Sequence, residues 1–207
     1  MIAIDGPAGA GKSTVARALA ARLGLAYLDT GAMYRAATLA VLRNGIPVHD
    51  DERVAELVDQ LDIDVDDTGV RIDGSDATAE IRSREVTESV SAIAANSAVR
   101  ASLVERQRAW ARERGGGVLE GRDIGSVVFP DARLKLYVTA SPRIRAERRV
   151  AEIGGDIVEV EASIIERDRK DSTRADSPLR EADGSTLVDT SGMTVDEVVE
   201  RIVELLA

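Results

Sequence analysis

The chain has 207 residues, of which 44% are hydrophobic and 31% are charged, a composition typical of a globular domain with a sizeable core. It contains no cysteine and a single histidine, His49, which argues against disulfides, thiolate metal sites and histidine-rich catalytic centres. The net charge of -10 argues against binding to the phosphate backbone of nucleic acids. Neither a signal peptide nor an apolar run of membrane-spanning length is visible, so we expect a cytoplasmic protein without a membrane partner.

The first part of the chain alternates short apolar runs with amphipathic segments. Residues 2–5 form an apolar run that ends at a glycine, which predicts a buried strand, and 12–23 has the spacing of a helix. A strand is then expected at 25–28, a helix at 32–43 with Thr30 as its cap, and another helix at 51–61.

The middle of the chain changes period. Residues 61–65 and 70–73 alternate apolar and polar side chains on either side of a turn at 66–69, which predicts a β-hairpin within a small insert. Residues 84–114 are strongly helical, and we expect two helices that are broken near Asn96.

The last part returns to short strands and helices. Strands are expected at 118–120, 134–138 and 187–189, and helices at 142–152, 158–169 and from 195 onward, with Ser141 and Thr194 as N-caps. Five short strands that alternate with helices predict an α/β fold with a parallel sheet covered on both faces.

A glycine-rich segment follows the first strand. Residues 6–13, GPAGAGKS, match the pattern G-x-x-x-x-G-K-[ST] in full, with a strand before it and a helix after it as the motif requires. The glycines let the backbone N–H groups point at phosphate oxygens, and the start of the helix favours the same anion. Lys12 would reach the β- and γ-phosphates, and the Ser13 hydroxyl would bind Mg²⁺. The segment predicts a nucleoside triphosphate site but does not separate a kinase from a GTPase or ATPase switch.

Charged motifs follow two of the expected strands. The segment 29–35, DTGAMYR, comes after the second strand, and 120–125, EGRDIG, leaves a buried strand. Ligands of open α/β sheets bind at the carboxyl ends of the strands, where both motifs should lie. Arg35 lies near a helix N-terminus, where the dipole does not favour a cation, so we interpret it as holding an anion. Gly121 and Gly125 suggest a close approach of the backbone to a ligand, although a surface turn with an internal ion pair would give the same pattern.

Two further segments carry clustered arginines. Arg167, Asp171 and Arg174 have helical spacing and are expected on one face, with a solvated helix face as the alternative. The helix that ends at Gly154 carries Arg143, Arg145, Arg148 and Arg149, which could form a solvated face or the hinge and arginine supply of a closing lid. Together the clusters favour phosphoryl transfer, because that reaction needs positioning and positive charge rather than a nucleophilic side chain.

With these motifs in this order, the sequence resembles the bacterial cytidylate kinases, a family in the nucleoside monophosphate kinase group of P-loop proteins. The resemblance covers essentially the whole chain and rests on GPAGAGKST, LDTGAMYR, the segment up to AEIRSREV, RQRAW, EGRDIGSVVFPDA and ERDRKDSTRADSPL. It implies a single domain, 1–207, with a three-layer α/β/α core, a monophosphate-binding insert at 35–100 and a small helical lid at 149–164. It also implies transfer of the γ-phosphoryl group of ATP, with Mg²⁺, to CMP or dCMP.

The same resemblance implies roles for individual residues. ATP would be held by Gly6, Pro7, Ala8, Gly9, Ala10, Gly11, Lys12, Ser13 and Thr14. The cytosine would lie among Thr30, Arg100, Asp123 and Arg174, the pentose near Ser91, Arg167 and Asp171, and the acceptor phosphate between Arg35 and Arg122. We expect Lys12 with the lid residues Arg145 and Arg149 to act in catalysis, and Ser13 to be the metal ligand.

The residues leave some points open. Many relatives have Asp where this chain has Glu120 and Thr where it has Ser126, and we expect neither departure to change the reaction. A P-loop kinase with another small acceptor is the nearest alternative. A nucleotide-binding switch without phosphotransfer is a second one, although the N-K-x-D string of guanine-specific GTPases does not occur. We expect a monomer, because no long apolar surface stripe is left unassigned.

Overall fold

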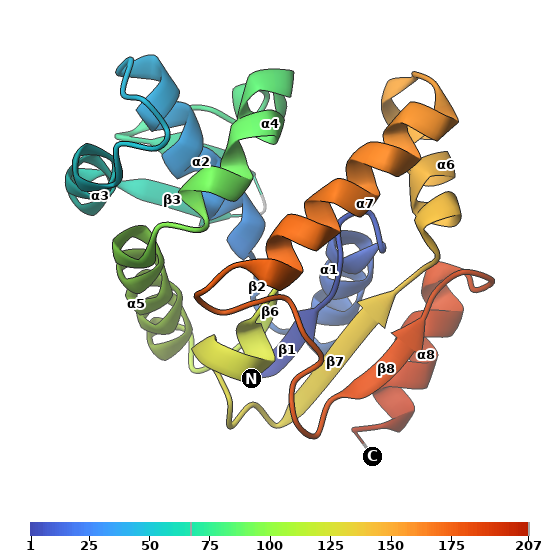
Figure 1. Ribbon diagram of the computed structural model, residues 1–207. Helices are drawn as coiled ribbons and strands as arrows, with labels where there is room; N and C mark the ends of the chain where they lie inside the picture. Colours follow the sequence, from blue (N-terminus) through green and yellow to red (C-terminus); the bar gives the residue numbers. More distant parts are fainter. Residues whose placement is uncertain (67, 207) are drawn as a thin grey trace. The chain divides into compact units, whose positions relative to one another are not determined.

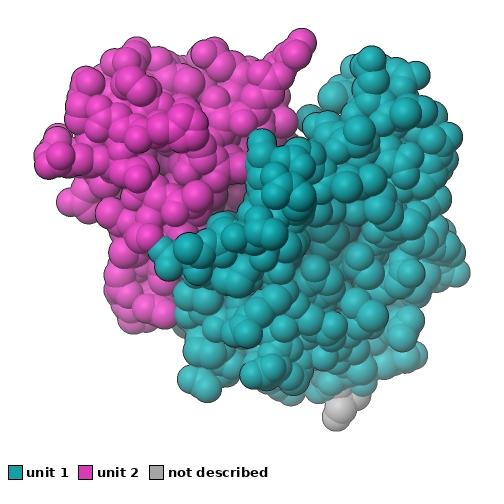
Figure 2. Space-filling model, in the orientation of Figure 1, with its two compact units in different colours: residues 1–27, 115–207 teal, residues 28–114 magenta. Residues whose placement is uncertain are grey.

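The computed structural model describes residues 1–66 and 68–206. The chain divides into two compact units (Figure 2): unit 1 consists of residues 1–27 and 115–207, and unit 2 of residues 28–114. Unit 2 is wider than the expected insert at 35–100.

The main sheet has five strands in the order β2-β6-β1-β7-β8 (Figure 1), and all but the edge strand β2 lie entirely in the first unit. Its strands are β1 Ile2–Asp5, β2 Tyr27–Asp29, β6 Val118–Gly121, β7 Leu134–Thr139 and β8 Thr186–Asp189. The pairs β1–β6, β1–β7 and β7–β8 are parallel. The predicted five-stranded parallel sheet is thereby confirmed, and its strands β1 and β6 are buried along their whole length.

Helices α1 (Lys12–Leu23) and α8 (Val195–Glu204) pack together on one face of this sheet (Figure 1). Leu19 and Ile202 are fully buried in one apolar cluster with strand residues such as Ile4. The predicted capping box is present, since Thr194 and Glu197 bond each other's backbone N–H groups. With helices on the opposite face as well, unit 1 has the expected three-layer α/β/α arrangement.

Two helices that pack against each other connect β7 to β8 (Figure 1): α6 Pro142–Ile153 and α7 Ile157–Thr173. Ser141 caps α6 as predicted. Since α7 ends at Thr173, Arg174 has extended backbone, and the prediction of one helix face for Arg167, Asp171 and Arg174 is wrong for the third residue. The π-helical turn η2, Ile124–Val128, was not predicted, because its residues carry no regular period.

Unit 2 contains four α-helices and a small sheet. The helices are α2 Thr30–Arg43, α3 Asp51–Gln60, α4 Arg84–Ile93 and α5 Ser97–Glu113, and η1 Glu80–Arg82 is a short 3-10 turn. The sheet has the order β3-β4-β5, with β3 Ile63–Asp66, β4 Gly69–Ile72 and β5 Ser75–Asp76. The predicted antiparallel hairpin is confirmed, although a third strand extends it, and residue 67 of the predicted turn lies outside the described residues.

Side-chain caps explain where two helices of unit 2 begin. Asn96 accepts hydrogen bonds from the N–H groups of Ala98 and Val99, which starts α5 at the predicted break. The prediction that Thr30 caps α2 is wrong. The cap is Asp29, whose carboxylate accepts the N–H of Ala32 at 2.9 Å, and Thr30 is the first residue of the helix. No helix in the described ranges is long and apolar enough to cross a membrane.

Candidate active site

The glycine-rich loop connects β1 to α1 with a backbone that only glycine adopts readily. Gly6, Gly9 and Gly11 have φ angles of 146°, 74° and 86°. A Cβ on Gly6 would overlap the carbonyl oxygen of Val138, so the loop approaches β7 more closely than a side chain allows. The segment therefore has the tight curvature expected of a phosphate cradle.

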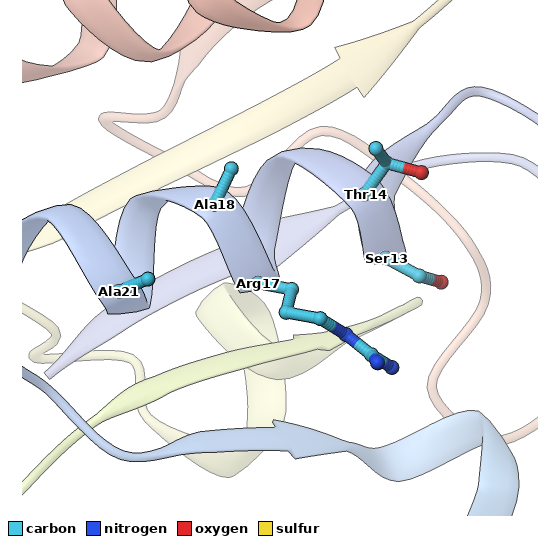
Figure 3. A pocket seen from close by; sticks show the side chains of 5 residues that line it. All are labelled: Ser13, Thr14, Arg17, Ala18 and Ala21. Carbon is cyan, nitrogen blue, oxygen red and sulfur yellow. The ribbon is translucent and has the colours of Figure 1, made fainter. Parts of the chain in front are cut away.

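Two side chains of this loop fit a triphosphate and its metal. Lys12 is buried, and its ammonium donates to the Pro7 carbonyl at 2.9 Å, so a fixed positive charge lies against the loop. The Ser13 hydroxyl is exposed at the first turn of α1 and is a hard oxygen donor of the kind that Mg²⁺ prefers. Ser13 and Thr14 lie at one end of a surface hollow of about 470 Å³, with Arg17, Ala18 and Ala21 farther along the helix (Figure 3).

Arg145 braces the same loop from α6. Its side chain is only 4% exposed, and its guanidinium donates to the carbonyl oxygens of Ala140 at 2.9 Å and of Ala8 at 3.0 Å. It also pairs with the Asp168 carboxylate at 2.6 Å. Arg149, the other expected lid arginine, is 34% exposed and lies 3.3 Å from Glu152. Arg145 thus links the loop, the end of β7 and α7.

A second brace was missed by sequence reasoning. Arg148 donates to both the hydroxyl and the carbonyl of Thr190, at 3.1 and 2.8 Å, and the Thr190 hydroxyl donates to the Ala10 carbonyl at 3.1 Å. Thr190 follows β8 at the carboxyl end of the sheet, and this position is the sequence feature that could have indicated a role near the loop.

The arginines expected around the acceptor lie at the carboxyl side of β6 and on α7. Arg122 pairs with Asp171 at 2.9 Å. Burial by itself would lower the pKa of Arg122, but the charge and the hydrogen bond of Asp171 hold it above its ordinary value. Burial and the positive charge of Arg122 lower the pKa of Arg167 to about 10, and its Nε has no hydrogen-bond partner among the described residues. Because the positive charge of Arg122 disfavours that of Arg167, an anion beside the two groups would be favoured.

Asp123 and Arg174, the pair expected at the cytosine, are brought together. Their side chains are buried and lie 3.7 Å apart, and the Nε of Arg174 also donates to the Ser177 carbonyl at 2.6 Å. A carboxylate beside a guanidinium presents an acceptor and donors side by side, which is the arrangement that an amino group next to ring acceptors requires.

Glu120 and Ser126, where many relatives have Asp and Thr, are both packed within the protein. Glu120 is buried and accepts the Tyr27 hydroxyl at 2.7 Å, and the guanidinium of Arg17 lies over the Tyr27 ring at 5.2 Å. The Ser126 hydroxyl is buried, with no hydrogen-bond partner in the described part of the chain.

Four expected substrate residues belong to unit 2. Arg35 donates to the Ile81 carbonyl and to the Thr87 hydroxyl, both at 3.0 Å. The Arg100 guanidinium lies 5.6 Å from the centre of the Tyr34 ring. Thr30 is buried at the start of α2, and Ser91 is half-buried on α4. Their association with the residues of unit 1 remains a prediction.

Asp5, at the end of β1, was not anticipated as part of the site. It is 3% exposed, and its two carboxylate oxygens accept the N–H groups of Ile124 and Gly125, each at 2.7 Å. Burial raises its pKa to about 6, in spite of these two hydrogen bonds. The signal available in the sequence was an acid at the end of an otherwise apolar strand, directly before the first glycine of the loop.

A glycine-rich loop between the first strand and first helix of a parallel sheet, with arginines at the carboxyl ends of the strands, defines a P-loop kinase of the α/β/α class. The fold is shared with a sugar kinase from Janibacter sp. HTCC2649, which superposes with a TM-score of 0.52 over 99% of this chain and 92% of that chain, at 14% identity.

The particular family follows from the sequence. The family model for cytidylate kinase matches residues 2–207, and the chain belongs to that family. It is 51% identical to a cytidylate kinase from Rhodococcus opacus (strain B4), over 98% of this chain and 92% of the relative. It is 49% identical to a bifunctional pantoate ligase/cytidylate kinase from Prochlorococcus marinus (strain MIT 9313), over 99% of this chain. The chain spans 43% of the length of that bifunctional relative. The resemblance seen in the motifs is therefore confirmed.

Proposed function

We propose that the protein transfers the γ-phosphoryl group of ATP to CMP and dCMP, giving CDP or dCDP and ADP, with Mg²⁺. Family membership supports this reaction. The structural observation that carries the proposal is the combination, within unit 1, of a phosphate loop containing the buried Lys12 and a group of charged side chains at the acceptor side, in which Arg122 pairs with Asp171 and Arg167 is nearby.

The chemistry requires little from side chains beyond charge and position. An oxygen of the acceptor phosphate attacks the γ-phosphorus, the bond from that phosphorus to the β–γ bridging oxygen breaks, and ADP leaves with the electron pair. The attacking oxygen is already ionised, so no general base is needed. Lys12 and the loop N–H groups neutralise charge on the donor phosphates, and Arg122 orients the attacking phosphate with Arg35. The Ser13 hydroxyl would hold Mg²⁺, which would supply further neutralisation of the donor's negative charge.

The base would be read by the buried pair Asp123–Arg174 with Thr30 and Arg100. The Asp123 carboxylate accepts the N4 amino group of cytosine, while the arginines donate to O2 and N3. Uracil carries an oxygen in place of that amino group and would face the carboxylate, which disfavours UMP. Ser91, Arg167 and Asp171 would meet the pentose, and Asp171 can bond either of its hydroxyls, which is consistent with the use of dCMP.

The remaining expectations belong to the same proposal. The chain works as a single P-loop kinase domain and as a monomer in the cytoplasm, the insert at 35–100 moves with the acceptor, and the segment 149–164 closes to exclude water. Arg145 and Arg149 are the lid arginines assigned to catalysis, and the 34% exposure of Arg149 leaves its side chain able to reach a ligand.

An acceptor panel in a coupled ADP-release assay tests the proposal. CMP and dCMP should give the highest kcat/KM values, UMP a lower value, and shikimate or dephospho-coenzyme A only background turnover. Lys12→Ala should lower kcat by about 100-fold or more while the protein stays folded. Lys170→Ala, which removes an exposed lysine of α7, is the matched control and should leave turnover unchanged. Preference for another acceptor would favour a different P-loop kinase, and ATP binding without any acceptor-dependent ADP formation would favour a switch protein.

A further inference from the structure

The buried carboxylate at the end of β1 is a charged group that the proposed reaction does not use. We propose that Asp5 is a positioning residue that holds the turn carrying Arg122 and Asp123 in its substrate-binding conformation, by binding the N–H groups of Ile124 and Gly125. The kinetic part of this inference rests on the proposed function.

The geometry is that of a two-point clamp. One oxygen of Asp5 accepts the N–H of Ile124 and the other that of Gly125, each at 2.7 Å. These two residues begin η2 and immediately follow Asp123. In the parallel pair β1–β6, Asp5 lies opposite Gly121, so the carboxylate reaches past the end of β6 to the turn that leaves it. Both oxygens are used, and both bind this one turn.

Gly125 leaves little room for a side chain in the same arrangement. A Cβ at this position would lie 3.1 Å from the Cγ and Cδ atoms of Lys135 and 3.3 Å from a carboxylate oxygen of Asp5. In the sequence we had interpreted Gly125 as a point where a ligand approaches the backbone. In the structure the close neighbours at this point are Lys135 and Asp5, so the spacing in EGRDIG suits the clamp.

The charge of Asp5 is unfavourable for the fold, which indicates a role beyond stability. Burial raises its pKa to about 6, the nearby Asp123 adds to this effect, and Lys12 opposes it. The charge of Asp5 also contributes to the raised pKa of Tyr137, from β7. A neutral side chain would avoid this cost of burial. The carboxylate, however, offers an acceptor to each of two adjacent N–H groups, which an amide cannot do.

The clamp is tested first without substrate. In the wild-type protein the amide ¹H–¹⁵N resonances of Ile124 and Gly125 should shift together with a midpoint near pH 6, because protonation removes one acceptor from Asp5. In Asp5→Asn this titration should disappear. Asp131→Asn, which changes an exposed acid of the same unit, is the matched control and should keep it. The inference would be overturned if acidification shifted neither resonance in the wild-type protein, or if the shift persisted in Asp5→Asn.

Steady-state kinetics then show whether Asp5 positions the turn that binds CMP or supports the loop that binds ATP. Asp5→Asn should lower kcat/KM for CMP by about 10- to 100-fold, the loss expected for a displacement of about 1 Å, while KM for ATP changes by less than about threefold. An unchanged kcat/KM for CMP would refute the role, and so would an equal loss for both substrates, which would mean general damage to the site.

A second variant keeps the test decisive if Asp5→Asn does not fold. Gly125→Ala places a methyl group against the Asp5 carboxylate and should also lower kcat/KM for CMP more than it changes KM for ATP. If the wild-type protein phosphorylates no nucleoside monophosphate, the proposed function fails, while the amide titration still decides whether the clamp exists.

Discussion

Replacing Asp168 by Asn removes the acid that holds the arginine brace of the phosphate loop. The Arg145 side chain is 4% exposed, and it pairs with the Asp168 carboxylate at 2.6 Å in addition to its hydrogen bonds with the carbonyls of Ala8 and Ala140. Removing one member of a buried ion pair costs about 3–5 kcal/mol, because the other charge remains buried. Asp168 is 21% exposed, and Asn still offers an oxygen, so we expect a smaller loss of unfolding free energy, about 1–3 kcal/mol.

The same change should weaken ATP binding, because Arg145 bonds the Ala8 carbonyl within the loop. We expect KM for ATP to rise about 5- to 20-fold, which corresponds to about 1–2 kcal/mol. Urea unfolding measures the first quantity and steady-state kinetics the second. Glu166→Gln on the same helix removes an exposed pair with Arg169 and should change the unfolding free energy by less than about 0.5 kcal/mol.

A double-mutant cycle with Arg145→Met decides whether the two residues act as a pair. Because they are in direct contact, the losses in the single variants should not add, and the interaction energy should exceed about 1 kcal/mol. Additive losses, or a loss in Asp168→Asn no larger than that in Glu166→Gln, would refute the idea that this ion pair supports the loop.

Two further predictions concern Asp123 and Asp5. Asp123→Ala should lower the ratio of kcat/KM for CMP to that for UMP by about 10-fold or more, measured with both acceptors under the same conditions, and an unchanged ratio would mean that this carboxylate does not read the base. Asp5 should make the protein less stable as pH rises from about 4 to about 6, because in this window the folded state binds its proton while the unfolded state, with the ordinary pKa of 3.8, has released it. The full effect is about 3 kcal/mol, and it is measured as the difference in unfolding free energy between the wild-type protein and Asp5→Asn across this range.

Elements defined by local patterns were predictable from the sequence. The bounds of α1 and β1 agree with the predicted ranges, because an apolar run that ends at a glycine and a helical apolar period both depend on near neighbours. The start of α8 and the break before α5 follow from caps that lie within three residues of the N–H groups they bind. The strand β5 was missed since two residues are too few to show alternation.

The supports of the site could not be predicted, because they join distant parts of the chain. Asp5 and Ile124 are 119 residues apart, Arg145 and Ala8 are 137 apart, and Thr190 and Ala10 are 180 apart. No local period indicates which buried acid will face which N–H group. The resemblance supplied candidate residues at the substrate, but the pairing of Arg122 with Asp171 and the bracing role of Arg145 required the three-dimensional structure.

In the proposed function, neighbouring residues of helix α7 serve both the donor and the acceptor. Asp168 holds the arginine that braces the phosphate loop, while Arg167 and Asp171 are the residues that we propose to bind the pentose of the acceptor. Without substrate, Arg122, Arg167 and Asp171 together carry one positive charge. The acceptor phosphate brings about two negative charges, which should raise the lowered pKa of Arg167 and compete with Asp171 for Arg122. Acceptor binding would then free the Asp171 carboxylate for a hydroxyl of the pentose, so that the phosphate and the sugar are recognised together.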